Sequence, residues 1–83
     1  MSDSVVTRSK SEIRQWLVSA IRARQMRSVE IDTSLPFYSY GVDSVERMSI
    51  AYELEVWLGF AIGDDALREH DTIDKLAAHL AGE

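Results

Sequence analysis

The chain has 83 residues, a formal net charge of −5 and 46% hydrophobic residues. This length allows one small domain with a modest core, and the hydrophobic content argues against disorder. The acidic balance disfavours nucleic acid as a partner, and the absence of cysteine excludes disulfides and cysteine-based zinc sites. We find no apolar run that would form a signal peptide or a membrane span, so we expect a cytoplasmic protein without a membrane partner.

The charge is unevenly distributed along the chain. Residues 1–27 contain six basic and two acidic residues, a net charge of +4, whereas residues 28–83 contain three basic and twelve acidic residues, a net charge of −9. The acidic part could steer a basic partner, but charge alone is better explained by an ordinary solvated surface.

A first helix is predicted to begin at Ser9, because Ser9 and Glu12 have the spacing of a capping box. Residues 1–8 before it are expected to form a flexible tail, and residues 9–83 the folded domain. Apolar residues then recur at helical spacing and form one stripe: Ile13, Trp16, Leu17, Ala20 and Ile21.

Helical periodicity stops from about Gln25 to Asp43, where turn-forming residues are frequent. A loop of this length is unusual in a small domain unless it packs or has a function. We expect it to lie over the core, because it contains four large apolar residues: Ile31, Leu35, Phe37 and Tyr40.

The second half of the chain is also predicted to be helical. A helix should begin at Asp43 or Ser44 and end near Gly59, and a short turn should follow at residues 64–67. The last helix is expected to begin near residues 71–72 and to stop at Gly82. No alternation typical of strands occurs, so we predict an all-α fold.

The predicted helix that starts near Ser44 has two apolar stripes on roughly opposite sides. At 100° per residue, one side holds Ile50, Leu54, Trp57 and Leu58, and the other holds Val45, Met48, Tyr52 and Val56. A surface helix normally needs one such stripe. The second is either covered by the loop or the first helix, or presented to a partner, and periodicity leaves both interpretations open.

A candidate modification site lies at the start of this helix, where Ser44 follows Gly41, Val42 and Asp43. A helix N-terminus offers free N–H groups and a dipole that favours an anion, so a phosphodiester on Ser44 would be well placed there. Taken alone, the pair Asp43-Ser44 at a helix start is most often only a helix cap.

Three motifs in order resemble the acyl carrier protein family. The run from Phe37 to Val45 is similar to the F-x-x-x-G-x-D-S-[LV] signature, and residues 53–59 resemble the E-L-E-x-x-L-G end of the family's second helix. Residues 71–80 look like its fourth helix, P-T-I-x-x-L-A-x-H-L, in polyketide synthase carriers, with Asp71 in place of proline. The resemblance covers nearly the whole chain from about Ser9.

The resemblance implies a four-helix bundle with a long loop between helices one and two and a short third helix, here around Asp64–Glu69. It also implies a 4'-phosphopantetheine arm from coenzyme A on Ser44, with Asp43 as the adjacent motif acid, and an acyl thioester on the arm. The implied partners are a phosphopantetheinyl transferase, an acyl-loading enzyme (an adenylating ligase or acyltransferase) and a ketosynthase or other acyl-processing enzyme. The implied recognition face comprises Val45, Glu46, Met48, Ser49, Tyr52, Glu55 and Val56.

The recognition face differs from that of strongly acidic fatty-acid carriers. Ser49 and Val56 stand where those carriers usually have acids, so we expect more apolar, less salt-sensitive docking. The ends of the chain, Met-Ser-Asp and Ala-Gly-Glu, are typical of a free-standing carrier, although a domain from a larger synthase can look the same.

Three other functions compete with this interpretation. A peptidyl carrier of nonribosomal peptide synthesis would use the same serine, but usually has two glycines before the motif, whereas Gly41-Val42 favours the acyl branch. An unmodified helical interaction module would expose the same apolar stripe. An enzyme fits poorly, because His70 and His79 have no serine elbow or cysteine to activate and are expected on the surface.

Four aspartates, at positions 64, 65, 71 and 74, lack calcium-loop spacing and are interpreted as caps, so no metal site is predicted.

Overall fold

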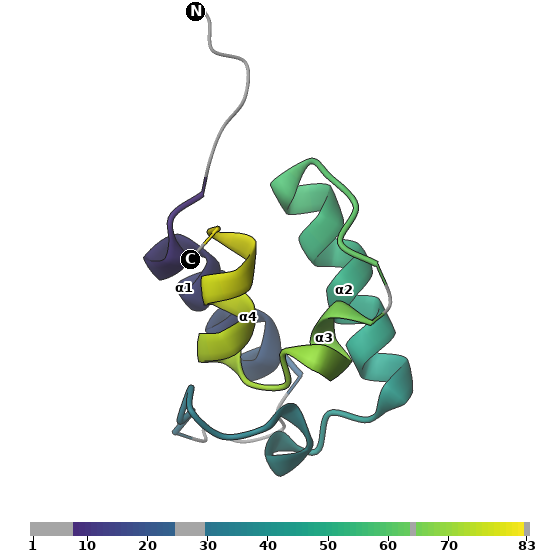
Figure 1. Cartoon of the computed structure of the whole chain (residues 1–83). Helices are drawn as coiled ribbons and strands as arrows, with labels where there is room; N and C mark the ends of the chain where they lie inside the picture. The colour runs from purple at the N-terminus through teal and green to yellow at the C-terminus, as the bar shows by residue number, and fades with distance from the viewer. Residues whose placement is uncertain (1–7, 25–29, 64, 83) are drawn as a thin grey trace, which may run out of the picture.

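The computed structural model describes residues 8–24, 30–63 and 65–82. Within these ranges the chain forms four α-helices and one 3₁₀ helix (Figure 1): α1 (Lys10–Arg22), η1 (Phe37–Tyr40), α2 (Ser44–Leu58), α3 (Ala66–Glu69) and α4 (Ile73–Leu80). The described residues contain no β-strand. The predicted all-α fold with a short third helix is therefore confirmed. Asp64, the expected start of that helix, lies outside the described residues, as do residues 1–7 of the expected tail.

Helices α1, α2 and α4 begin where the sequence predicts because each has a local polar cap. Ser9 and Glu12 form the predicted capping box of α1, and the Ser9 backbone N–H that Glu12 accepts lowers the pKa of this carboxyl. Asp43 caps α2, and the hydroxyl of Thr72 accepts the Lys75 N–H to cap α4. Helix α2 ends at the predicted glycine, Gly59, whose φ of 88° suits a residue without a Cβ.

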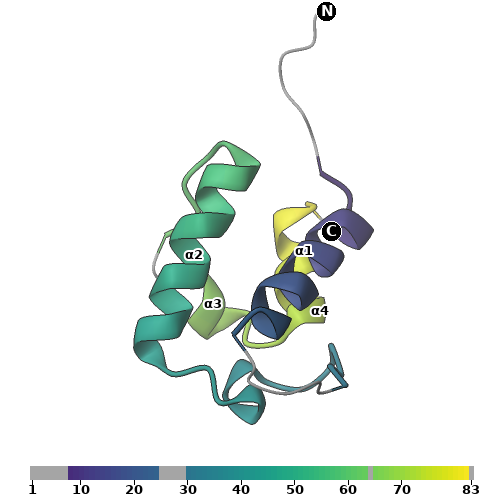
Figure 2. The same cartoon turned by 180° about the vertical axis from the view of Figure 1, so that it is seen from behind.

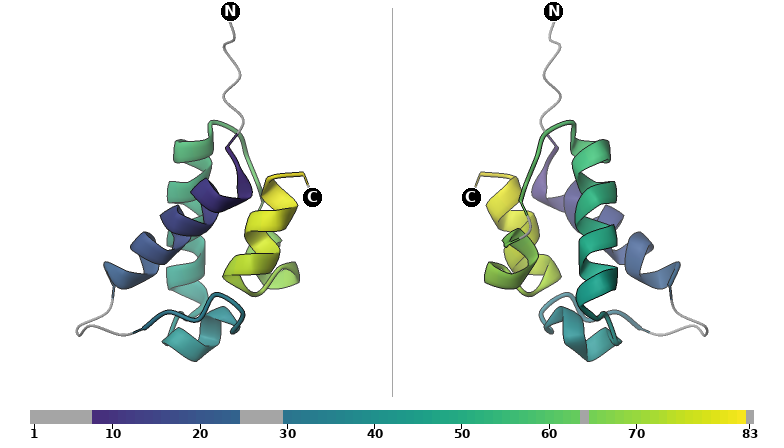
Figure 3. Two further views of the ribbon diagram at one scale, coloured as in Figure 1. Left: turned by 90° about the vertical axis from the view of Figure 1, so that its left-hand side faces the viewer. Right: turned by 90° about the vertical axis from the view of Figure 1, so that its right-hand side faces the viewer.

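The helices pair as α1 with α4 and α2 with α3. Figure 2 shows α3 between α2 and α4, and the side views in Figure 3 show α1 crossing α2 at an angle. The loop from residue 30 to 43 runs along one end of the bundle and leads into the start of α2. The buried apolar core draws on the four α-helices and this loop: Ile13, Leu17, Ile21, Phe37, Val42, Ile50, Ala51, Leu54, Ala66, Leu67, Ile73, Leu76 and Ala77.

An aromatic stack joins α1 to α2. The rings of Trp16 and Trp57 lie 5.6 Å apart at 20°, and the Arg8 guanidinium carbon lies 4.4 Å from the centre of the Trp57 ring. Trp57 was predicted on the same side as the buried Ile50 and Leu54, but it is half-buried at this edge of the core. Leu58 is also half-buried, because it closes the last turn of α2.

The long loop packs over the core at most, but not all, of its predicted positions. Phe37 is buried in η1, a helix that the sequence did not predict, and Ile31 and Tyr40 pack half-buried against the core. Leu35 remains 42% exposed, so the prediction that it lies over the core was wrong.

Two backbone hydrogen bonds fasten this loop to the last helix and the residues before it. The Phe37 N–H donates to the Asp71 carbonyl at 2.9 Å, and the Asp74 N–H donates to the Thr33 carbonyl at 3.0 Å. Residues 25–29 of the predicted loop lie outside the described residues. In the described ranges, none of the helices has the length and apolar character needed to cross a membrane.

Candidate functional site

Ser44 is the first residue of α2, and its position follows from the residues before it. Gly41 ends η1 with a φ of 77°, a left-handed conformation that favours glycine. The carboxylate of Asp43 accepts the Glu46 N–H at 2.8 Å, and the Asp43 N–H donates to the Glu46 carboxylate at 3.4 Å. This reciprocal pair fixes the first turn of α2 and leaves the Ser44 side chain exposed to solvent.

Arg47, one turn into α2, contacts the candidate hydroxyl. Its Nη2 donates to the Ser44 Oγ at 3.4 Å. Two hollows, of about 350 Å³ and about 230 Å³, adjoin this pair, and both are lined by Ser44, Arg47 and Leu67. The larger is completed by Phe37, Tyr38, Val42, Asp43 and Asp71, and the smaller by Met48, Asp65 and Arg68.

The second apolar stripe of α2 is exposed. The exposed fractions are 72% for Val45, 62% for Met48, 68% for Tyr52 and 67% for Val56. Ser49, between them, is also exposed. Of the two interpretations left open by periodicity, coverage by the loop or by α1 is therefore wrong for the described residues.

The two acidic residues of the predicted recognition face are half-buried and engaged locally. Glu46 completes the cap of α2, as described above. The carboxylate of Glu55 accepts the N–H groups of Ile62 at 3.0 Å and Gly63 at 3.2 Å, and so holds the segment that leaves α2. Sequence reasoning missed this role, because the contact depends on where the chain turns after Gly59.

The two histidines stack on each other, and two of the four aspartates considered as metal ligands form local ion pairs. The rings of His70 and His79 stack with their centres 3.9 Å apart; His79 is exposed, as predicted, whereas His70 is half-buried. Asp65 pairs with Arg68, and Asp71 with Lys75. In the part of the chain that the structure describes, no three His, Asp or Glu side chains cluster as metal ligands would.

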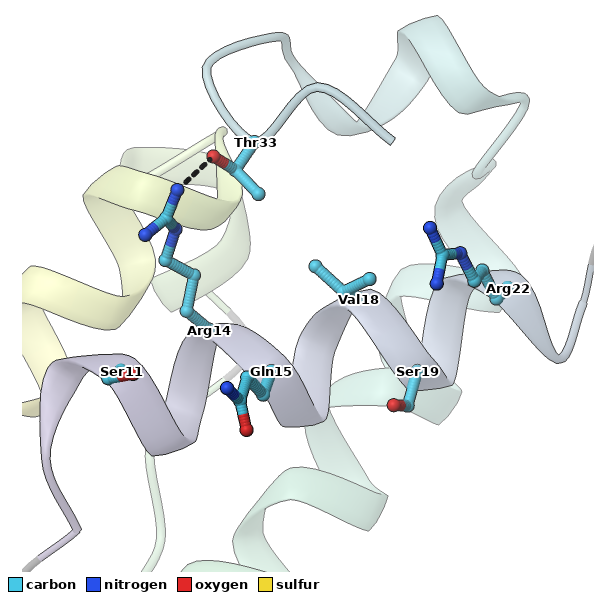
Figure 4. Close-up of a pocket in the computed structure, with 7 residues that line it drawn as sticks. All are labelled: Ser11, Arg14, Gln15, Val18, Ser19, Arg22 and Thr33. Carbon is cyan, nitrogen blue, oxygen red and sulfur yellow. Dashed lines mark hydrogen bonds between the residues drawn. The ribbon is translucent and has the colours of Figure 1, made fainter. Parts of the chain in front are cut away.

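A third hollow lies along α1 and the loop (Figure 4). Arg14 lies toward one end of this hollow. Its guanidinium donates a hydrogen bond to Thr33 Oγ1 at 3.2 Å and forms an ion pair with Asp74 at 3.0 Å. Arg22 lies at the other end, with Val18 between them. Arg14 therefore ties the loop and α4 to α1, and none of the predicted site residues lines this hollow.

Comparison with known proteins decides the family. Residues 15–80 match the protein family described as the phosphopantetheine attachment site. The chain belongs to the acyl carrier protein family. The cofactor of this carrier protein is accordingly phosphopantetheine, and both the all-α fold and the family resemblance in the sequence are confirmed.

Two relatives of the carrier protein differ in length, one being similar to this chain and the other much longer. It is 28% identical over 78 residues to the acyl carrier protein TtuC of Teredinibacter turnerae, covering 93% of this chain and 90% of TtuC. It is 34% identical over 76 residues to a phenolphthiocerol/phthiocerol polyketide synthase of Mycobacterium tuberculosis, covering 90% of this chain but 4% of that much longer protein.

The residues around Ser44 fit the arm of a carrier protein. The hydroxyl is exposed, it stands at a helix N-terminus, and a guanidinium contacts it. The helix N-terminus and the guanidinium both favour an anion at this position. The two hollows that Ser44 lines leave space for a substituent on the hydroxyl.

Proposed function

We propose that Ser44 is the attachment point of the 4'-phosphopantetheine arm and that the chain carries acyl groups on it for delivery to partner enzymes. The observation that carries this proposal is the exposed hydroxyl of Ser44 on the first residue of α2, directly after the Asp43 cap. The match of residues 15–80 to the family supports it, because the motif lies within that range. The arm supplies a terminal thiol that carries the acyl group as a thioester.

The role of the chain is presentation rather than catalysis. A phosphopantetheinyl transferase joins the Ser44 oxygen to the phosphorus of the arm, while the bond to the nucleotide half of coenzyme A breaks and the hydroxyl proton leaves. The capping box keeps this hydroxyl at a fixed helix start, and the tether raises the local concentration of the acyl group at each partner.

The exposed stripe of α2 is proposed as the face that partners recognise. Its four apolar side chains begin at Val45, beside Ser44, and extend to Val56 in the last turn. An exposed apolar patch of this kind is typical of interaction sites. The partners we propose are the transferase, a loading enzyme and a ketosynthase or similar enzyme. The resemblance to part of a polyketide synthase favours polyketide or related biosynthesis.

The test is intact-protein mass spectrometry after incubation with coenzyme A and a broad-specificity phosphopantetheinyl transferase. We expect wild type to gain the mass of one phosphopantetheine and Ser44→Ala to gain none. Ser19→Ala is the matched control, because Ser19 is an exposed serine on α1, outside the proposed recognition face. It should be loaded like wild type.

Two results would overturn the proposal. Loading of Ser44→Ala would move the attachment point to another residue. No loading of folded wild type, with a known carrier modified in parallel, would favour an unmodified interaction module that uses the same exposed stripe.

A further inference from the structure

We propose that Arg47 is the residue that holds the phosphodiester of the arm at the start of α2, so that it positions the arm where it leaves the protein. This inference rests on the proposed attachment to Ser44. It concerns a cation of this chain that the serine motif itself does not include. The contact that points to it is the 3.4 Å distance from Arg47 Nη2 to Ser44 Oγ.

The charge around Ser44 favours a nearby cation. The carboxylates of Asp43 and Glu46 already lie in the first turn, where they form the reciprocal cap. A phosphodiester on Ser44 adds a third negative charge beside them. Like charges at this separation repel, and the helix dipole offsets only part of that repulsion. A guanidinium within reach of the serine oxygen neutralises one of the three.

Arg47 is available for this role, whereas Arg68, the other cation that lines the hollows beside Ser44, is engaged. Within the described residues Arg47 forms no ion pair, while Arg14, Arg24 and Arg68 pair with Asp74, Glu53 and Asp65. Arg47 also lines both hollows beside Ser44, so it stands next to either path that a substituent on the hydroxyl takes. A planar guanidinium can donate two parallel hydrogen bonds to phosphate oxygens, which a lysine ammonium cannot.

The experiment compares the apo and arm-bearing forms of the same variant. Wild type, Arg47→Gln, Arg47→Lys and Arg68→Gln are each loaded with coenzyme A and the transferase, and mass spectrometry confirms the form before any other measurement. Arg68→Gln is the matched control, because Arg68 lines the smaller hollow but pairs with Asp65. Glutamine keeps a high helix propensity, so α2 should form in every variant.

Two readouts follow. The first is the change in Tm from the apo to the arm-bearing form, in which the effect of the substitution on the fold itself cancels. We expect the change in Tm on loading to be about 2 to 4 °C less favourable in Arg47→Gln than in wild type. An exposed charge pair produces a shift of this size in a domain of this length. The second is the ³¹P resonance of the phosphodiester, which should move in Arg47→Gln and not in Arg68→Gln. Arg47→Lys should fall between wild type and Arg47→Gln.

The outcomes separate this inference from the proposed function. If Ser44 is loaded but Arg47→Gln matches wild type in both readouts, Arg47 does not hold the phosphodiester, and the attachment to Ser44 stands. If Ser44 is not loaded at all, mass spectrometry shows this first, and both proposals fail together. Equal changes in Arg47→Gln and Arg68→Gln would show a general effect of surface charge and would also overturn the inference.

Discussion

Asp43 links the serine motif to the geometry of the helix that follows it. Its carboxylate accepts the Glu46 N–H at 2.8 Å, so the acid beside Ser44 is also the cap of α2. A cap involves residues close in sequence, which explains why the start of this helix could be predicted. The hydrogen bonds that Glu55 accepts from the Ile62 and Gly63 N–H groups could not be predicted, because they form only where the chain turns back along α2.

We expect Asp43→Ala to lower the free energy of unfolding by about 1 kcal/mol, since the Glu46 N–H loses its acceptor. Asp43→Asn keeps an acceptor oxygen and should stay within about 0.5 kcal/mol of wild type. Urea denaturation followed by circular dichroism measures both. An equal loss in the two variants would mean that the charge of Asp43, rather than its hydrogen bond, stabilises the start of α2.

Helix α2 has two apolar faces with different roles. Ile50, Ala51 and Leu54 are buried in the core, whereas the face that includes Met48 and Tyr52 is exposed. Periodicity identified both faces, since it depends only on the helical repeat. It could not decide which face was covered, because that depends on how α1, α4 and the loop pack. Trp57 shows the same limit, as its stacking on Trp16 depends on how α1 crosses α2.

The two faces of α2 should respond differently to substitution. Met48→Glu changes an exposed side chain and should alter the free energy of unfolding by less than about 0.5 kcal/mol. It should raise the KM of the carrier in the transferase reaction about fivefold or more, because it places a charge on the docking face. Leu54→Ala leaves a cavity in the core and should cost about 2–5 kcal/mol of stability.

Denaturation curves and loading kinetics for the two variants separate these effects. Folded Leu54→Ala should retain a KM near that of wild type, because Leu54 has no exposed surface. A wild-type KM for Met48→Glu would remove the exposed stripe from the proposed recognition face.

Contacts between segments far apart in sequence hold the helices and the long loop together. Arg14 joins α1 to Thr33 and Asp74, and the Phe37 N–H joins the loop to Asp71. Turn-forming residues predicted that a loop exists, and its apolar residues predicted that it packs. The 3₁₀ helix at residues 37–40 and the burial of Val42 were not predicted, because both follow from the space that α4 and α2 leave at this end of the bundle.

The net charge of the whole chain bears on how the carrier docks to its partners. The chain has a net charge of −5, yet the exposed stripe of α2 is apolar, and its two nearby acids, Glu46 and Glu55, bond to the backbone of their own chain. Docking through such a surface depends on apolar contact, which salt does not screen, more than on attraction between charges.

We therefore expect the KM of the carrier in the transferase reaction to change by less than about threefold between roughly 0.05 and 0.5 M NaCl. Electrostatically steered association falls steeply over that range. Loading kinetics at several salt concentrations measure this, with a strongly acidic fatty-acid carrier as the comparison and a check that the transferase itself stays active. If the KM of this chain rises as steeply as that of the acidic carrier, then its acidic residues, rather than the stripe on α2, dominate docking.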